Sequence, residues 1–166
     1  MKHVAIVFGK LENKSFERYT FPILGRPVAR YPLLAACHSK RIAKGFLSSD
    51  DEALLEVGES MGDVLLLRRE KSQPSLTEEV RNALGKVREV LGAQPECITI
   101  LLANSPCVTS TMLDNAIAKL EEENVSSVVS AMKREEFNPE RLFTMDQDHR
   151  LHYPKLDALQ DQEVYF

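Results

Sequence analysis

The chain has 166 residues, about the size of one domain, of which 43% are hydrophobic and 28% are charged. Its formal net charge of −4 argues against a general nucleic-acid binder, because such domains usually carry a basic face. No stretch approaches the roughly 18 uninterrupted apolar residues of a membrane span, and the N-terminal apolar run is too short for a signal peptide. These properties predict a soluble, cytoplasmic protein.

Strand-like apolar runs alternate with helical patterns along most of the chain. Local signals support the boundaries: Pro27 is placed in a first helical turn, where its missing N–H costs least, and Asp50 or Asp51 is expected to cap the next helix. In chain order, the predicted elements are a strand at 3–8, a helix at 26–40, a strand at 44–50, a helix at 52–62, a strand at 63–68, a helix at 77–92, a strand at 97–106, a helix at 109–124 and a strand at 125–132.

This alternation predicts an α/β fold, a doubly wound and mainly parallel sheet with helices on both faces. The run at 97–106 is the longest apolar one and is expected to be a central strand, buried on both faces. After Met132 an Asn-Pro turn signal and a polar "DQDHR" lie between short apolar segments, which predicts an antiparallel hairpin at the sheet edge. The last residues, ending in "VYF", form no complete element.

The first predicted strand is followed by a loop with a cation at every fourth residue: Lys10, Lys14 and Arg18. In doubly wound sheets ligands bind outside the carboxyl ends of the strands, so these cations would meet a polyanion such as phosphate. The chain lacks GxxxxGK[ST], and Gly9 has no further glycines at dinucleotide-fold spacing, which argues against a P-loop ATPase or a Rossmann oxidoreductase. The alternative interpretation is that the three cations are solvated loop charges that bind no ligand.

Other reactive residue types form no recognisable site. The three cysteines, Cys37, Cys97 and Cys107, are widely spaced and contain no CxxC pair, so neither a zinc ribbon nor a redox motif is expected. His149 and His152 lie in a polar stretch without an acidic cluster at metal-site spacing. No metal ligands are therefore identified.

Several segments resemble the cytidylyltransferases that activate acidic sugars with CMP, the family of CMP-N-acylneuraminate synthetases. The segments that carry the resemblance are "FGKLENKSFERYTFPILGRP", "LSSDDEALLEVGESMGDVLLLR", "ILLANSP" and "SSVVSAMKREEFNPERLFTMDQDHRL". They cover nearly the whole chain in the family's order. The resemblance implies a single nucleotide-binding domain over residues 1–166, without the C-terminal part of the family fold.

The resemblance also implies an activity: CTP and an acidic sugar, such as a nonulosonate, give a CMP-sugar and pyrophosphate, with Mg²⁺ neutralising the triphosphate. Positioning and charge stabilisation would supply most of the catalysis. Lys10 and Lys14 would be catalytic, no nucleic acid or membrane is expected as a partner, and a homo-oligomer is expected. The residues implied to bind the nucleotide are Phe8, Gly9, Lys10, Lys14, Arg18, Arg68, Ser75 and Asn104.

The chain departs from the family pattern in the parts that carry the chemistry. Glu12 and Glu17 put negative charge into the loop that would hold the triphosphate, and the loop has lost most of the family's glycines. Leu102 stands where the commoner branch has Gln for the sugar. The sequence therefore leaves a second reading open, a catalytically impaired homologue that acts as a nucleotide-binding or structural, oligomeric module. A nucleotidyltransferase for another sugar or base is a third.

Overall fold

The structure is a computed structural model that describes residues 3–11, 18–71, 75–131 and 144–152. The chain divides into two compact units, Met1–Val128 and Val129–Phe166. The helices of the first unit are α1 (Arg30–His38), α2 (Glu52–Glu59), α3 (Leu76–Leu91) and α4 (Ser110–Glu122). None of the helices in the described ranges is both long and apolar enough to cross a membrane.

The first unit is built on a four-stranded parallel sheet with the strand order β5-β4-β1-β6, which confirms the predicted α/β class. The strands are β1 (His3–Phe8), β4 (Lys44–Ser49), β5 (Val64–Arg68) and β6 (Cys97–Leu102). The chain first runs outward from β1 through β4 to β5 and then returns to place β6 on the other side of β1. The order of the strands therefore reverses between β1 and β6.

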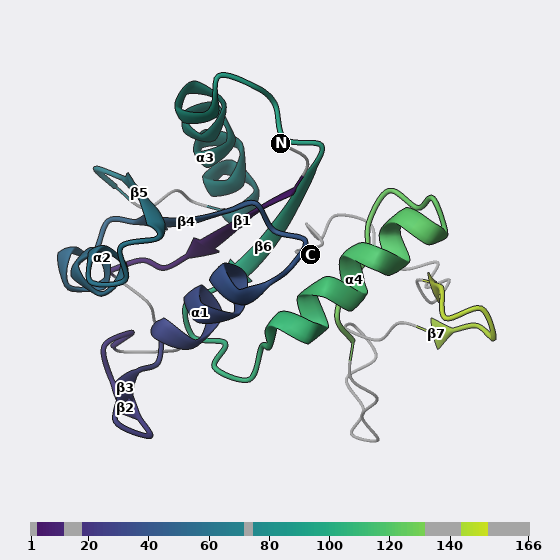
Figure 1. Cartoon of the computed structure of the whole chain (residues 1–166), viewed down its shortest axis with the longest axis horizontal. Coiled ribbons are helices and arrows are strands. Elements are labelled where there is room, and N and C mark those ends of the chain that lie inside the picture. Colours follow the sequence, from purple (N-terminus) through teal and green to yellow (C-terminus); the bar gives the residue numbers. More distant parts are fainter. Residues whose placement is uncertain (1–2, 12–17, 72–74, 132–143, 153–166) are drawn as a thin grey trace, which may run out of the picture. The chain divides into compact units, whose positions relative to one another are not determined.

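Helices cover both faces of this sheet, with a separate hydrophobic core on each side (Figure 1). Alternate residues of β1 supply the two cores, since successive side chains of a strand point to opposite faces. On one side α3 packs through Ala83 and Val87. The core on that side contains Val4, Ile6, Phe8, Phe46, Leu67, Ala83 and Val87. The opposite core receives side chains from α1, α2 and α4.

The predicted central strand lies at an edge of the described sheet. Among the described strands β6 pairs with β1 alone, in the register Ile6 to Ile100 and Phe8 to Leu102. Ile100 is 47% exposed and Leu102 44% exposed. The apolar run alone could not separate a central strand from this edge strand, because both are rich in Ile and Leu.

The predicted helix at 26–40 begins later than expected, at Arg30. A short antiparallel pair, β2 (Pro22–Ile23) and β3 (Arg26–Pro27), takes up the first residues. Leu24 and Gly25 turn the chain with φ of 49° and 77°, the left-handed conformation that tight hairpins require. Pro32, not Pro27, lies in the first helical turn, where no intrahelical N–H bond is lost.

The strand predicted at 125–132 is wrong over its described part. Residues 125–131 form no strand, although Val125, Val128 and Val129 are β-branched. β-propensity depends on packing against neighbouring strands more than on the backbone itself. In the second unit, the predicted hairpin forms as β7 (Thr144–Met145) and β8 (Leu151–His152). The two strands make a sheet of their own, whereas an edge of the main sheet was predicted.

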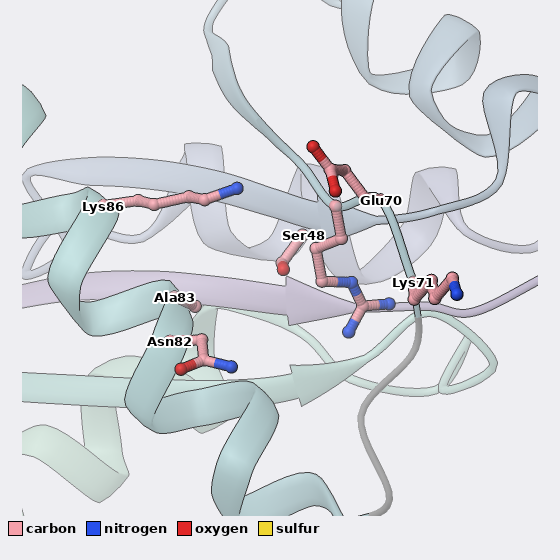
Figure 2. Close-up of a pocket in the computed structure, with 7 residues that line it drawn as sticks. Ser48, Glu70, Lys71, Asn82, Ala83 and Lys86 are labelled. Atoms are coloured by element: carbon pink, nitrogen blue, oxygen red, sulfur yellow. The ribbon is translucent and has the colours of Figure 1, made fainter.

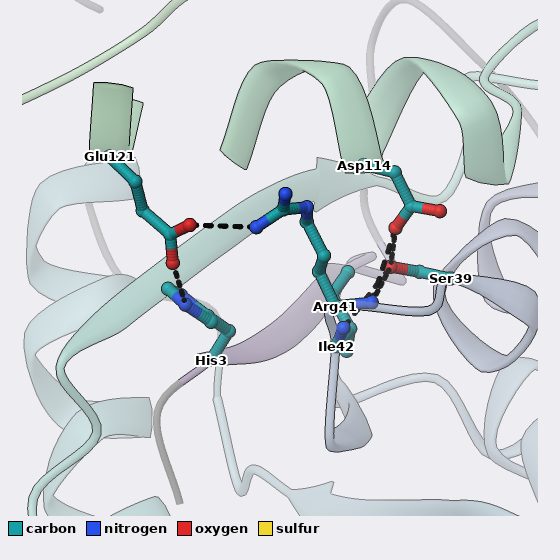
Figure 3. A network of polar contacts seen from close by, with 6 residues as sticks. All are labelled: His3, Ser39, Arg41, Ile42, Asp114 and Glu121. Atoms are coloured by element: carbon teal, nitrogen blue, oxygen red, sulfur yellow. Dashed lines mark hydrogen bonds and ion pairs between the residues drawn. The ribbon is translucent and has the colours of Figure 1, made fainter. Parts of the chain in front are cut away.

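A polar network ties α4 to β1 and to the loop before β4 (Figure 3). Ser39 donates a hydrogen bond to Asp114, and this bond lowers the pKa of the Asp114 carboxyl. Glu121 accepts hydrogen bonds from His3, at 2.9 Å, and from Arg41, at 2.7 Å. The His3 hydrogen bond, followed by the Arg41 charge, holds the pKa of Glu121 below its usual 4.5.

This network predicts a loss of stability in acid. A carboxyl whose folded-state pKa is lowered stabilises the fold above its unfolded-state pKa, and that contribution disappears as the pH falls through the folded-state value. The urea midpoint should therefore fall between about pH 5 and pH 3, and Glu121→Gln should flatten the fall. Glu122→Gln, the exposed neighbour, is the control. Equal pH profiles for all three proteins would contradict the prediction.

Candidate functional site

The carboxyl ends of the four strands form the edge of the sheet at which a ligand is expected. β1 leads into Gly9 and Lys10, and β6 leads into Ala103 and Asn104. These two connections flank the point where the strand order reverses. The N–H of Ala103 donates to the Phe8 carbonyl at 2.9 Å, which keeps the two strand ends together beyond the ladder itself.

The turn after β1 is closely packed at Gly9. A Cβ at this position would lie 2.2 Å from Leu54 Cδ2 and 3.2 Å from the Ala103 Cβ. Glycine is therefore required by space, because its backbone passes directly over the side chain of a buried leucine. The Gly9 N–H donates to the Ser48 carbonyl at 3.2 Å, so the first residue of the turn remains attached to β4.

Arg69 is the main polar anchor of this edge. Its side chain is only 7% exposed, and its Nη2 donates to the Gly9 carbonyl. Nη1 lies 2.8 Å from Glu79 Oε2 on α3, and Nη2 lies 3.4 Å from Asp50 Oδ1 after β4. One guanidinium thus joins the ends of three strands to α3.

Asp50 fixes the next part of the turn. Its Oδ1 accepts the N–H of Leu11 at 3.0 Å, in addition to its contact with Arg69. Asp51, the following residue, caps α2 by accepting the N–H groups of Ala53 and Leu54, as predicted for one of these two aspartates. The two adjacent carboxylates therefore have different partners, one in the turn and one in the helix.

The sequence of residues 11–164 matches the profile of the cytidylyltransferase family. The chain belongs to the cytidylyltransferase family. No curated protein sequence gives a significant match. The specific resemblance to the sialic-acid branch remains a prediction.

Solved cytidylyltransferase structures share the fold at low sequence identity. CMP:2-keto-3-deoxy-manno-octonic acid synthetase complexed with CTP has a TM-score of 0.62 and 13% identity, over 75% of this chain and 49% of that one. A cytidylyltransferase from Leptospira borgpetersenii gives 0.56 and 17%, over 71% and 48%. 4-Diphosphocytidyl-2C-methyl-D-erythritol synthase from Anaerococcus prevotii gives 0.60 and 14%, over 93% and 63%. The chain thus spans between about half and two thirds of the length of these relatives.

Within this cytidylyltransferase fold, the predicted nucleotide residues have varied surroundings. Gly9, Lys10 and Asn104 lie at the switch point, and Lys10 and Asn104 are half-buried. Phe8 is 3% exposed and packs in the core beside α3. Arg18 is exposed. Lys14, together with Glu12 and Glu17, lies outside the described residues. That Lys10, Lys14 and Arg18 together bind one anionic group therefore stays a prediction.

Two further predicted residues have structural partners. Ser75 is the N-cap of α3 and accepts the N–H of Glu78, so the helix begins at Leu76, one residue before its predicted start. Arg68 is 60% exposed and pairs with Glu52. Sequence reasoning missed Arg69, although strand alternation would have found it: Leu67 faces α3, so Arg69 lies on the same side and Arg68 on the other.

The expected Mg²⁺ has no assigned ligands among the described residues. No group of three or more His, Cys, Asp or Glu side chains within the described ranges is arranged to hold a metal ion. Asp50 and Glu79 are both engaged by Arg69. Any Mg²⁺ would therefore need ligands from the triphosphate itself or from other residues of the chain.

Proposed function

We propose that this chain is the nucleotide-binding part of a nucleotidyltransferase that couples CTP to an acidic sugar. The hydroxyl oxygen of the sugar would attack the α-phosphorus, a new P–O bond would form, and the bond to the β-phosphate would break to release pyrophosphate. The hydroxyl proton would pass to solvent or to a base. Membership of the cytidylyltransferase family, with a half-buried Lys10 at the strand switch point, is the observation that supports this most.

The residues of the turn would act by position and charge. Arg69 and Asp50 bind the backbone groups of Gly9 and Leu11, so the backbone of Lys10 between them is held in place at the edge of the sheet. An ammonium held there would stabilise the negative charge that develops on the triphosphate. Mg²⁺ remains part of the proposal as a partner of CTP, with no assigned protein ligand.

Pyrophosphate release is the direct test. Full-length protein, CTP and Mg²⁺ would be incubated with a panel of sugar acids, and each reaction repeated with ATP, GTP and UTP. Release that requires both CTP and a sugar acid would support the proposal. Absence of turnover and of nucleotide binding with every combination would overturn it.

Lys10→Met should lower kcat/KM for CTP by about a hundredfold to a thousandfold, because removing one donor to a developing oxyanion typically costs this much. Lys119→Met is the matched control, since Lys119 lies on α4 and pairs only with Glu123 among the described residues. Thermal unfolding of both variants would show that the fold is retained. Equal activity of both variants would remove Lys10 from the site.

One observation favours the second candidate, a catalytically impaired homologue. The Asp50 carboxylate already accepts the Leu11 N–H and contacts Arg69, which are donors of the kind that a phosphate would use. For such a protein we expect CTP binding without turnover, or neither. Titration of the protein with CTP, followed by isothermal titration calorimetry, measures nucleotide binding. Together with the pyrophosphate assay it separates these outcomes from the enzyme proposal.

Self-association is also part of the proposal. The edge strand β6 exposes Ile100 and Leu102, and exposed sheet edges with apolar side chains favour pairing with another chain. Light scattering coupled to size exclusion would measure the mass. A monomer at all accessible concentrations would contradict this part of the proposal.

A further inference from the structure

A pocket of about 430 Å³ lies beside α3 and adjoins the turn after β1, because two of its lining residues, Ser48 and Arg69, hydrogen-bond to Gly9. Ser48 and Ala83 form its buried part, and Asn82 and Lys86 extend into it from α3 (Figure 2). Glu70 and Lys71 complete its lining at the end of β5. The pocket has not been used in the proposed reaction.

Ser48 is an unusual residue for this position. Phe8, Ser48 and Leu67 are in register on three adjacent strands, and this row faces α3. Both neighbours of Ser48 in the row are apolar core residues. Ser48 is 1% exposed, and its Oγ has no hydrogen-bond partner among the described residues. A buried hydroxyl without a partner is destabilising, and a ligand atom in the pocket that accepts its hydrogen bond would remove that cost.

A second buried donor lines the same pocket. Arg69 Nε has no acceptor within the described part of the chain, although the other nitrogens of its guanidinium contact Gly9, Asp50 and Glu79. Two unused donors in one pocket call for a ligand atom that accepts hydrogen bonds.

Two lysines of the lining can contact an anion. Lys71 and Lys86 line the pocket together with one acidic residue, Glu70, whereas the charge of Arg69 is shared with Asp50 and Glu79. Lys86 Nζ donates to the Arg68 carbonyl, which leaves further N–H groups for a ligand. Glu70 and Lys71 are exposed, so the acidic group can turn to solvent while the hydroxyl and the guanidinium remain fixed.

We propose that this α3 pocket binds a small phosphorylated ligand, with a phosphate oxygen against Ser48 and Arg69 and with Lys86 and Asn82 at the other oxygens. A phosphate offers several acceptor oxygens and matches this set of donors better than a single water molecule, which occupies only about 30 Å³. The remaining volume would hold the organic part of the ligand. This binding does not depend on CTP use.

The test is a calorimetric titration of the full-length protein with inorganic phosphate and with glycerol phosphate. Acetate is titrated in parallel, to compare a carboxylate anion with the two phosphates. Both phosphates should bind, with a dissociation constant of about 1 mM or lower, and acetate should not compete. Ser48→Ala should weaken binding about tenfold, the loss expected for one hydrogen bond to a charged group. Lys86→Met should weaken it to a similar extent.

Two controls keep the result specific. Ser60→Ala changes an exposed serine whose hydroxyl bonds, among the described residues, to the Val57 carbonyl, and it should leave phosphate binding unchanged. Lys119→Met, which removes a cation on α4 outside the pocket lining, should also leave it unchanged. Equal binding by wild type, Ser48→Ala and Lys86→Met would overturn the proposal, as would loss of binding in Lys119→Met or equal affinity for acetate. Failure of CTP turnover has no bearing on these outcomes.

Discussion

Arg69→Met should destabilise the fold by about 3–5 kcal/mol, the cost of removing one partner from a buried ion pair. The Arg69 side chain is 7% exposed, and those of Asp50 and Glu79 are 12% and 8% exposed. Without the guanidinium, the two buried carboxylates would lose the positive charge that they share. The Gly9 carbonyl would also lose its donor. Urea unfolding of the variant and the wild type at neutral pH measures the difference.

Arg68→Met is the matched control, because it changes the same residue type at the next position. Arg68 and Glu52 are 60% and 66% exposed, and an exposed ion pair of this kind contributes at most about 1 kcal/mol. A double variant, Arg69→Met with Glu79→Met, should recover part of the loss because it removes one uncompensated carboxylate. Equal unfolding free energies for Arg68→Met and Arg69→Met would disprove the anchoring role of Arg69.

The two arginines illustrate what the sequence could and could not predict at the site. The resemblance implied a nucleotide contact at Arg68, and that role stays a prediction. The sequence analysis missed that its neighbour Arg69 is buried: Leu67 lies in the α3 core, so Arg69 is on the same face of the strand. Strand periodicity applied through residue 69 would have identified the buried arginine.

The fold followed from local patterns more completely than the site did. Alternating strands and helices were enough to predict a parallel sheet, because parallel strands require helical crossovers. The place of β6 at an edge and the absence of a strand over 125–131 depend on which segments pair, which no local pattern specifies. Asp50 and Asp51 were likewise equally good candidates for the cap of α2. The structure distinguishes them, because Asp50 accepts the N–H of Leu11 and Asp51 accepts the N–H of Ala53.

Gly9 has a steric role in the structure that its place in the sequence did not indicate. In the sequence it resembled part of a flexible, phosphate-binding loop, where glycine lets backbone N–H groups approach an anion. In the structure its N–H donates to Ser48 and its carbonyl accepts from Arg69. What excludes a side chain is the Leu54 methyl group, 2.2 Å from the position of a Cβ.

Gly9→Ala should therefore destabilise the protein by about 1–3 kcal/mol, the usual cost of overpacking a filled core. Leu54 is fully buried and cannot turn away into solvent. Gly85→Ala is the control: nothing lies within 4 Å of a Cβ on that exposed helical glycine, so the substitution should stabilise α3 by about 0.5–1 kcal/mol.

A double-mutant cycle makes the steric explanation testable. Leu54→Ala alone should cost about 2–5 kcal/mol, because it leaves a cavity. Combined with Gly9→Ala, the total loss should be smaller than the sum of the two single losses by about 0.5–3 kcal/mol, since the new methyl group occupies space that the leucine has vacated. Urea midpoints of the four proteins give this coupling free energy. Strict additivity would mean that Gly9 is required for backbone conformation and not for the space above Leu54.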